Sequence, residues 1–230
     1  MAVNKKIFII AFIITVLILV SILLSNSILN DKREQVLMER MDLMVEEYED
    51  MQALLFMSDF FGEEATCLAL ENVLEKMNKE VWTLGGKLDS YRQATEGFMR
   101  DPFYQKQKET FNRKEVLYFS VLQKMQSMCP INQTIISFFY RKKDFCPDCD
   151  AQSFVISDIK HDLEKVNLDH ELPVFSFDAD TNIASISLLT KYYGVDSFPC
   201  IVVGDRSYCG LHDKEELLGI LCANNSLSIC

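Results

Sequence analysis

An uncharged apolar run near the N-terminus restricts the fold of this chain more than any other feature. No charged residue lies between Lys6 and Asp31, and Ile7–Leu24 is almost entirely apolar. At about 1.5 Å per residue, a helix of this length crosses a hydrocarbon core of roughly 30 Å. A cleaved signal peptide is the alternative, but its apolar core would be shorter, about 7–15 residues. We therefore expect residues 1–30 to form a short cytoplasmic stub and a signal anchor, with residues 7–29 in the lipid bilayer.

Charge and cysteine content favour one orientation of this anchor. Lys5, Lys6 and the free N-terminus indicate a cytoplasmic N-terminus, although Lys32 and Arg33 on the far side weaken the asymmetry. The chain has eight cysteines in 230 residues, which suits a compartment where disulfides persist. Its net charge of -11 disfavours nucleic acid as a partner. We expect a single-pass membrane protein whose C-terminal domain is extracytoplasmic.

Residues 31–131 have the pattern of a helical region. Apolar residues recur there at spacings of three and four, which predicts helices with one packing face each. Asp101-Pro102 is typical of a helix start, so the second and third helices should fold back on each other at that point. This hairpin would bring Cys67 near Cys129. The two cysteines then form either a structural disulfide or a pair of buried free thiols.

Residues 132–230 change to a pattern of short strands and helices. Strands are predicted at 134–140, 173–178, 200–203 and 206–209, and helices from the cysteine pair to about 166, at 183–193 and at 214–222. The crossover between the first two strands implies parallel pairing, and Gly204-Asp205 is a two-residue hairpin turn. The sequence thus predicts an α/β domain of order β-α-β-α-β-β-α, preceded by a transmembrane helix and an α-helical hairpin region.

Cys146-Pro147-Asp148-Cys149 lies at the turn between the first strand and the first helix of this domain. Two thiols at this spacing can close a disulfide with each other, and a helix N-terminus stabilises a thiolate. Pro147 suits the first helical turn, where its missing N–H is not needed. The pattern predicts redox chemistry in which one sulfur acts as a nucleophile near neutral pH.

The region 132–225 resembles the thioredoxin family. The resemblance lies in the element order, in the Cys-x-x-Cys at the first helix, and in Phe198-Pro199 just before the third strand. It implies a thioredoxin-like domain in which Pro199 is a cis proline packed beside the redox cysteines. It also implies that Phe198, Pro199 and Phe145 contact the substrate.

The same resemblance implies roles for the two cysteines. Cys146, at the exposed edge of the helix N-terminus, would attack a partner, and the more buried Cys149 would resolve the mixed disulfide. The chain would then be a membrane-tethered thiol–disulfide oxidoreductase that acts on extracytoplasmic proteins. Its partners would be protein thiols and disulfides, together with a membrane electron donor or acceptor, and it would need no cofactor. The chain departs from the family pattern at two places. Phe145 stands where thioredoxins usually have a tryptophan, and Tyr140 occupies the place of the buried Asp that thioredoxins carry six residues before the first cysteine.

Two other interpretations remain open at this point. The first is a non-catalytic thioredoxin-like binding module or scaffold. The second is a metal site ligated by Cys146, Cys149, Cys200 and Cys209, which the presence of a single Cys-x-x-Cys disfavours, because small zinc sites usually use two.

The remaining cysteines suggest further disulfides. Cys200 and Cys209 face each other across the predicted hairpin, within reach of a cross-strand disulfide that is either structural or a second redox pair. Cys222 and Cys230 either form another bridge or remain thiols.

Overall fold

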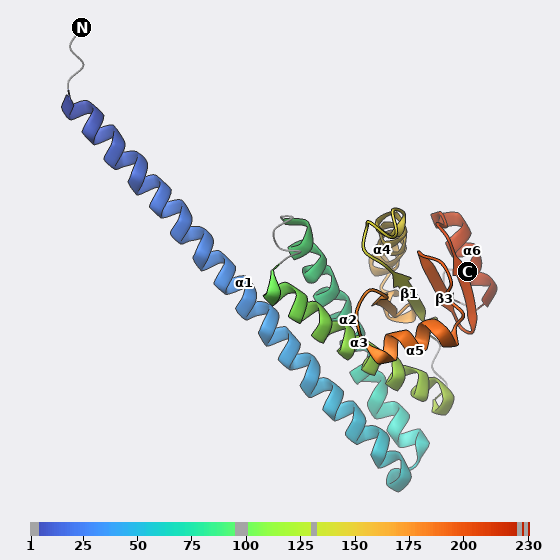
Figure 1. The fold of residues 1–230 in the computed structure, drawn as a ribbon. Helices are drawn as coiled ribbons and strands as arrows, with labels where there is room; N and C mark the ends of the chain where they lie inside the picture. The colour runs from blue at the N-terminus through green and yellow to red at the C-terminus, as the bar shows by residue number, and fades with distance from the viewer. Residues whose placement is uncertain (1–4, 95–100, 130–132, 225–226, 228–229) are drawn as a thin grey trace. The chain divides into compact units, whose positions relative to one another are not determined.

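The computed structural model describes residues 5–94, 101–129, 133–224, 227 and 230 (Figure 1). The contacts divide the chain into two units, Met1–Leu43 and Met44–Cys230. The first helix, α1, runs without interruption from Lys5 to Phe61 and so belongs to both units. The sequence predicted an anchor ending near residue 30 and a separate helix after it, whereas the backbone stays helical throughout.

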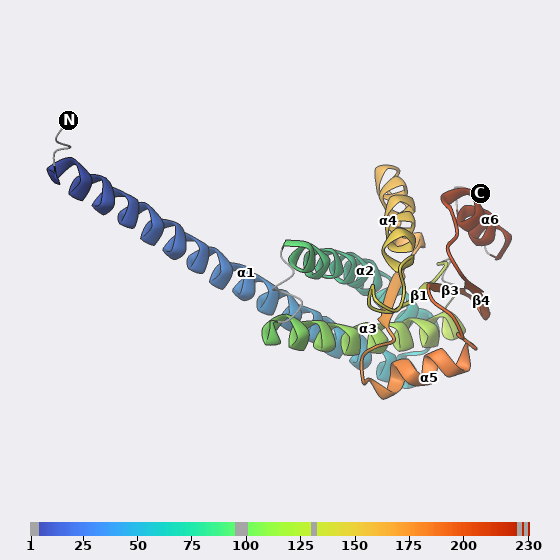
Figure 2. The same cartoon turned by 45° about the horizontal axis from the view of Figure 1, so that its top comes forward.

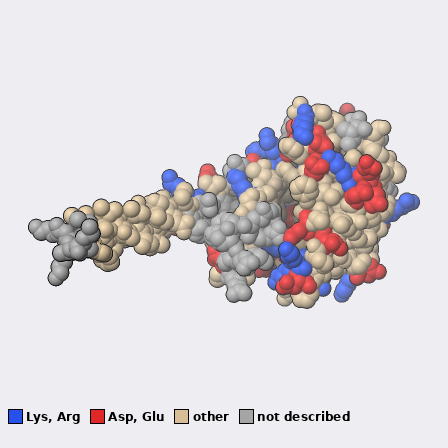
Figure 3. Space-filling view, turned by 90° about the horizontal axis from the view of Figure 1, so that it is seen from above, with Lys and Arg blue, Asp and Glu red and all other residues tan. Residues whose placement is uncertain are grey.

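The membrane-length part of α1 is Phe8–Leu29. It is the one helix in the described part of the chain that is long and apolar enough to cross a membrane by length and composition, and it lies near the N-terminus. None of it is buried against other residues of the chain, and Figure 3 shows this helix without charged side chains. The Thr15 hydroxyl donates to the Ala11 carbonyl at 2.9 Å, so this polar side chain is satisfied inside the helix.

Within residues 44–230, helices α2 (Glu63–Ala94) and α3 (Pro102–Met128) are paired by a disulfide and by packing. Asp101 is the N-cap of α3 and accepts from the Phe103 N–H at 2.9 Å, as the sequence predicted. Cys67 and Cys129 form a disulfide with a Cα–Cα distance of 5.6 Å. The Tyr118 hydroxyl donates to the Leu74 carbonyl at 3.2 Å between the buried faces.

The C-terminal part contains a four-stranded mixed sheet. Its strands are β1 (Ile136–Tyr140), β2 (Val174–Asp178), β3 (Cys200–Val203) and β4 (Arg206–Cys209), in the order β2-β1-β3-β4. The β1–β2 pair is parallel, and the other two pairs are antiparallel. The helices are α4 (Cys149–Lys165), α5 (Ala184–Tyr192) and α6 (Lys214–Asn224), with a 3-10 turn at Asp169–Glu171. This is the order of elements that the sequence predicted.

Helices cover both faces of the sheet. Figures 1 and 2 show α4 and α5 on opposite sides of the strands. Alternation along β1 and β2 separates the core residues, because neighbouring side chains point to opposite faces. On one side Ile136, Phe138 and Val174 pack with apolar residues of α4 and α6. On the other side Phe175 and Phe177 pack against the aromatic rings of α3.

Polar contacts join α3 to the edge strand β2. The Ser176 N–H donates to an oxygen of the Glu115 carboxyl group at 2.5 Å, and Lys108 forms an ion pair with the buried Asp178. Glu115 therefore pairs a backbone donor that an uncovered edge strand would present to solvent. The helical hairpin and the α/β sheet, which we expected as regions 31–131 and 132–230, lie within one compact unit.

Candidate functional site

The Cys-x-x-Cys lies on a turn between β1 and α4, as expected. The Phe145 and Cys146 N–H groups both donate to the Lys142 carbonyl, at 2.8 and 3.0 Å. Cys146 and Cys149 form a disulfide with a Cα–Cα distance of 5.4 Å. Helix α4 begins at Cys149, so the bond holds the Cys146 sulfur at the first helical turn. The free N–H groups and the positive end of the helix dipole at such a turn stabilise a thiolate.

The structure corrects the expected exposure of Cys146. The resemblance placed this residue at an exposed edge, but Cys146 is only 1% exposed and Cys149 only 4%. Phe145, Pro147 and Asp148 are exposed on either side of Cys146. The disulfide explains part of the difference, because it ties Cys146 to a helix whose inner face packs against the sheet.

The second element of the site is the segment before β3. The Phe198–Pro199 peptide bond is cis, as the resemblance implied. Pro199 is buried, and its carbonyl accepts from the Gly210 N–H at 2.8 Å. Cys200 follows directly and is paired in register with Phe139 of β1. The segment is thus fixed to the central strands on one side and to the end of β4 on the other.

Arg141 connects the cysteine turn to the proline segment. Its guanidinium carbon lies 4.6 Å from the centre of the Phe145 ring and 5.8 Å from the centre of the Phe198 ring. Both distances are within the range of a cation–π interaction. Phe145 immediately precedes Cys146, and Phe198 immediately precedes Pro199. These contacts bring together two of the site residues that the sequence singled out, Phe145 and Phe198, through a third residue that it did not.

Asp180, which the sequence analysis missed, holds this arrangement. Its carboxylate accepts from Arg141 Nε and from the Lys142 N–H, each at 2.7 Å. Burial raises the pKa of Asp180, but the hydrogen bonds from Lys142 and Arg141 and their charges outweigh it, so the pKa is lowered. Asp180 comes two residues after β2, at the carboxyl end of a strand parallel to β1, and that position is a signal that could have identified it.

Two further disulfides lie in the C-terminal part of the chain, and one of them begins at Cys200, directly after Pro199. Cys200 and Cys209 are bonded across the β3–β4 hairpin with a Cα–Cα distance of 3.9 Å, and Cys222 is bonded to Cys230. The four cysteines of the metal interpretation are therefore bonded as two separate pairs. In the described part of the chain, no group of three or more His, Cys, Asp and Glu side chains is arranged to hold a metal ion.

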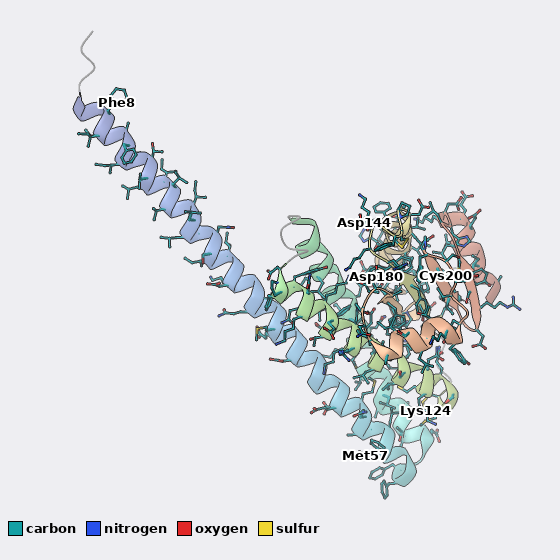
Figure 4. The ribbon with its side chains drawn as sticks, in the orientation of Figure 1. Phe8, Met57, Lys124, Asp144, Asp180 and Cys200 are labelled. Carbon is teal, nitrogen blue, oxygen red and sulfur yellow. A yellow bond between two sulfur atoms is a disulfide. The ribbon has the colours of Figure 1, made fainter. Side chains whose placement is uncertain are left out.

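The surface around the site is mixed in charge. Figure 3 shows acidic and basic side chains interspersed over the visible face of residues 44–230. Figure 4 labels Asp144, Asp180 and Cys200 in the α/β part of the chain. Arg141, Lys142 and Lys143 share this turn with the exposed Asp144 and Asp148, and Asp180 is paired with Arg141, so neither sign of charge dominates.

Comparisons with protein-family models, with curated proteins and with solved structures found no match for this chain.

Proposed function

We propose that this protein is a membrane-tethered thiol–disulfide oxidoreductase of the thioredoxin type. The observation that carries the proposal is the Cys146–Cys149 disulfide at the start of a helix, joined through Arg141 to the segment of the cis Phe198–Pro199 bond. A disulfide that spans only a strand-to-helix turn closes a short loop and constrains the unfolded chain less than a long-range disulfide does. Its position is therefore better explained by chemistry than by stability.

The reaction follows from the exchange chemistry of the pair. A substrate thiolate attacks the Cys146 sulfur, the bond to Cys149 breaks, and Cys149 leaves as a thiolate that takes up a proton. A second substrate thiolate then attacks the substrate sulfur of this mixed disulfide and releases Cys146. Two electrons and two protons pass from the substrate dithiol to the protein, and the reverse sequence reduces a substrate disulfide. The cysteine pair must then return to its starting redox state. This step needs a separate thiol or disulfide partner, such as a membrane electron donor or acceptor.

The N-terminal apolar helix supports the cellular placement. We propose that Phe8–Leu29 spans the bilayer once and that residues from about 31 onward are extracytoplasmic, where disulfides persist. The full chain should stay in membranes through an alkaline carbonate wash, and protease added outside should digest the C-terminal domain. Recovery of a soluble, shortened protein would identify the helix as a cleaved signal sequence instead.

Trapping of mixed disulfides tests the catalytic role. In the full-length Cys149→Ala variant, the Cys146 thiolate attacks a partner disulfide and displaces one of its sulfurs as a thiolate. Without Cys149 this mixed disulfide is not resolved, so partner proteins should appear as adducts on non-reducing gels. Peptide mapping should locate every adduct at Cys146. The Cys146→Ala/Cys149→Ala variant is the matched control and should trap nothing. Adducts that persist in this control would assign the exchange to another cysteine.

The burial of Cys146 favours one competing function. If its sulfur never becomes accessible, the disulfide is structural and the domain is a thioredoxin-like binding module. The Cys149→Ala variant would then trap no partner, while the wild-type chain would still co-purify with a partner through non-covalent contacts.

A further inference from the structure

Cys146 is buried although its neighbours along the chain are exposed. It is 1% exposed, whereas the preceding Phe145 is 62% exposed and the following Pro147 is also exposed. Its burial therefore depends on side chains near the turn and is not a result of a deeply buried backbone. An attacking thiolate must reach the Cys146 sulfur in line with the bond to Cys149, so those side chains must move before exchange.

Arg141 is the residue placed to hold such a cover. Its side chain starts directly after β1 and contacts the rings of Phe145 and Phe198 at 4.6 and 5.8 Å. Phe145 belongs to the turn that carries the redox pair and Phe198 to the cis-proline segment, and the two residues are far apart in the sequence. A planar guanidinium can contact both rings while Nε donates to a carboxylate, whereas a lysine ammonium makes such contacts less well.

Asp180 fixes the guanidinium in this place. It accepts from Arg141 Nε and from the backbone N–H of Lys142, so it holds both the side chain and the start of the turn. The Asp180 N–H in turn donates to Asp178 at 2.9 Å, and Asp178 is ion-paired with Lys108 of α3. The helical hairpin thus supports the side chain that joins the two aromatic rings.

We propose that Arg141, held by Asp180, is a positioning residue that keeps Phe145 and Phe198 closed over the oxidised cysteine pair. This inference deepens the proposed function and depends on it for its role in exchange. Binding of a substrate replaces the contacts of the two rings with Arg141, and the Cys146 sulfur becomes accessible. Access to the disulfide is then restricted to partners that engage the aromatic rings, and small thiols in solution react slowly.

The rate of reduction by dithiothreitol tests this proposal in the full chain in detergent micelles. Samples are quenched with acid and alkylated, and mass spectrometry follows each of the four disulfides separately. Loss of both ring contacts in Arg141→Gln should accelerate opening of Cys146–Cys149 by about 5- to 30-fold. Arg141→Lys keeps the positive charge but loses the planar contacts, and it should also accelerate opening.

The direction of the change separates a cover from an electrostatic effect. Removing a positive charge beside the disulfide would by itself slow attack by an anionic thiolate, so only loss of a cover predicts a faster reaction in Arg141→Gln. Arg113→Gln is a matched control, because it breaks an exposed arginine–carboxylate pair on α3 with Glu109. It should leave the rate unchanged.

The exposed Cys222–Cys230 disulfide is an internal standard for general loosening of the fold. Its rate should be the same in the wild type and in the Arg141 variants. Equal acceleration of all four disulfides, or no acceleration of Cys146–Cys149 in either variant, would overturn the proposal. Successful trapping at Cys146 without this acceleration would reject the cover alone, and acceleration without trapping would reject the proposed function.

Discussion

Removing the Cys67–Cys129 disulfide should destabilise residues 44–230 more than removing any other bridge. The bond closes a loop of 62 residues, whereas the Cys222–Cys230 bond closes a loop of 8. In the chain-entropy account, the stabilisation is about 4.3 kcal/mol for the first loop and about 2.5 kcal/mol for the second. The Cys67→Ala/Cys129→Ala variant should therefore lose about 1.8 kcal/mol more than the Cys222→Ala/Cys230→Ala variant.

Urea unfolding of the full chain in detergent measures this difference. The chain has one tryptophan, Trp82 of α2, so its fluorescence reports on the helical hairpin without competing signals. Cys129 is buried and Cys222 is exposed, so lost packing adds to the expected difference and does not oppose it. Equal losses in the two double variants, or a larger loss for the C-terminal pair, would refute the loop-length argument.

Two further predictions concern buried polar groups. Burial raises the pKa of Glu115 well above its ordinary value and outweighs the hydrogen bond from a backbone N–H, so the folded chain holds a proton that the unfolded chain releases. Its contribution to stability is then complete below the unfolded pKa of about 4.3 and falls as pH rises from there toward the folded pKa. Glu115→Gln should remove this decrease of the unfolding free energy with pH above about pH 4, measured by urea unfolding. An unchanged decrease in the variant would count against the assignment. Lys160 donates to the Leu172 carbonyl at 2.8 Å and lies over the Trp82 ring. Lys160→Met should cost about 1–3 kcal/mol in the same assay and shift the Trp82 emission, whereas Lys165→Met on the exposed face of α4 should do neither.

Local patterns in the sequence predicted most of the architecture. The order of strands and helices after residue 132 follows from hydrophobic periodicity and turn residues, both of which act over a few neighbouring positions. The start of α3 at Asp101-Pro102 and the Gly204-Asp205 turn depend on the same short-range effects. The pairing of Cys67 with Cys129 could be predicted, because the rise per residue in two antiparallel helices determines which positions lie at the same height along the hairpin.

Features that depend on distant residues were not predicted. Lys160 sits on the buried face of α4 beside Ile156, Ile159 and Leu163, and its ammonium group donates to the Leu172 carbonyl, 12 residues away in the sequence. Asp180 has no local signature that links it to Arg141, 39 residues earlier. The burial of Cys146 likewise depends on tertiary packing, which no spacing rule describes. The burial and pairing of Glu115 also could not be predicted, because its partner Ser176 lies in another element.

Selective reduction of the wild-type chain under native conditions shows whether the Cys146–Cys149 disulfide is a redox couple of the folded protein. The full chain is equilibrated with graded ratios of reduced and oxidised dithiothreitol, and each disulfide is scored by alkylation while Trp82 fluorescence reports the fold. We expect Cys146–Cys149 to open as a two-electron couple while the Cys67–Cys129 disulfide of the helical hairpin and the fluorescence stay unchanged. Opening of this pair only together with unfolding would show that its bond is structural and would contradict the account.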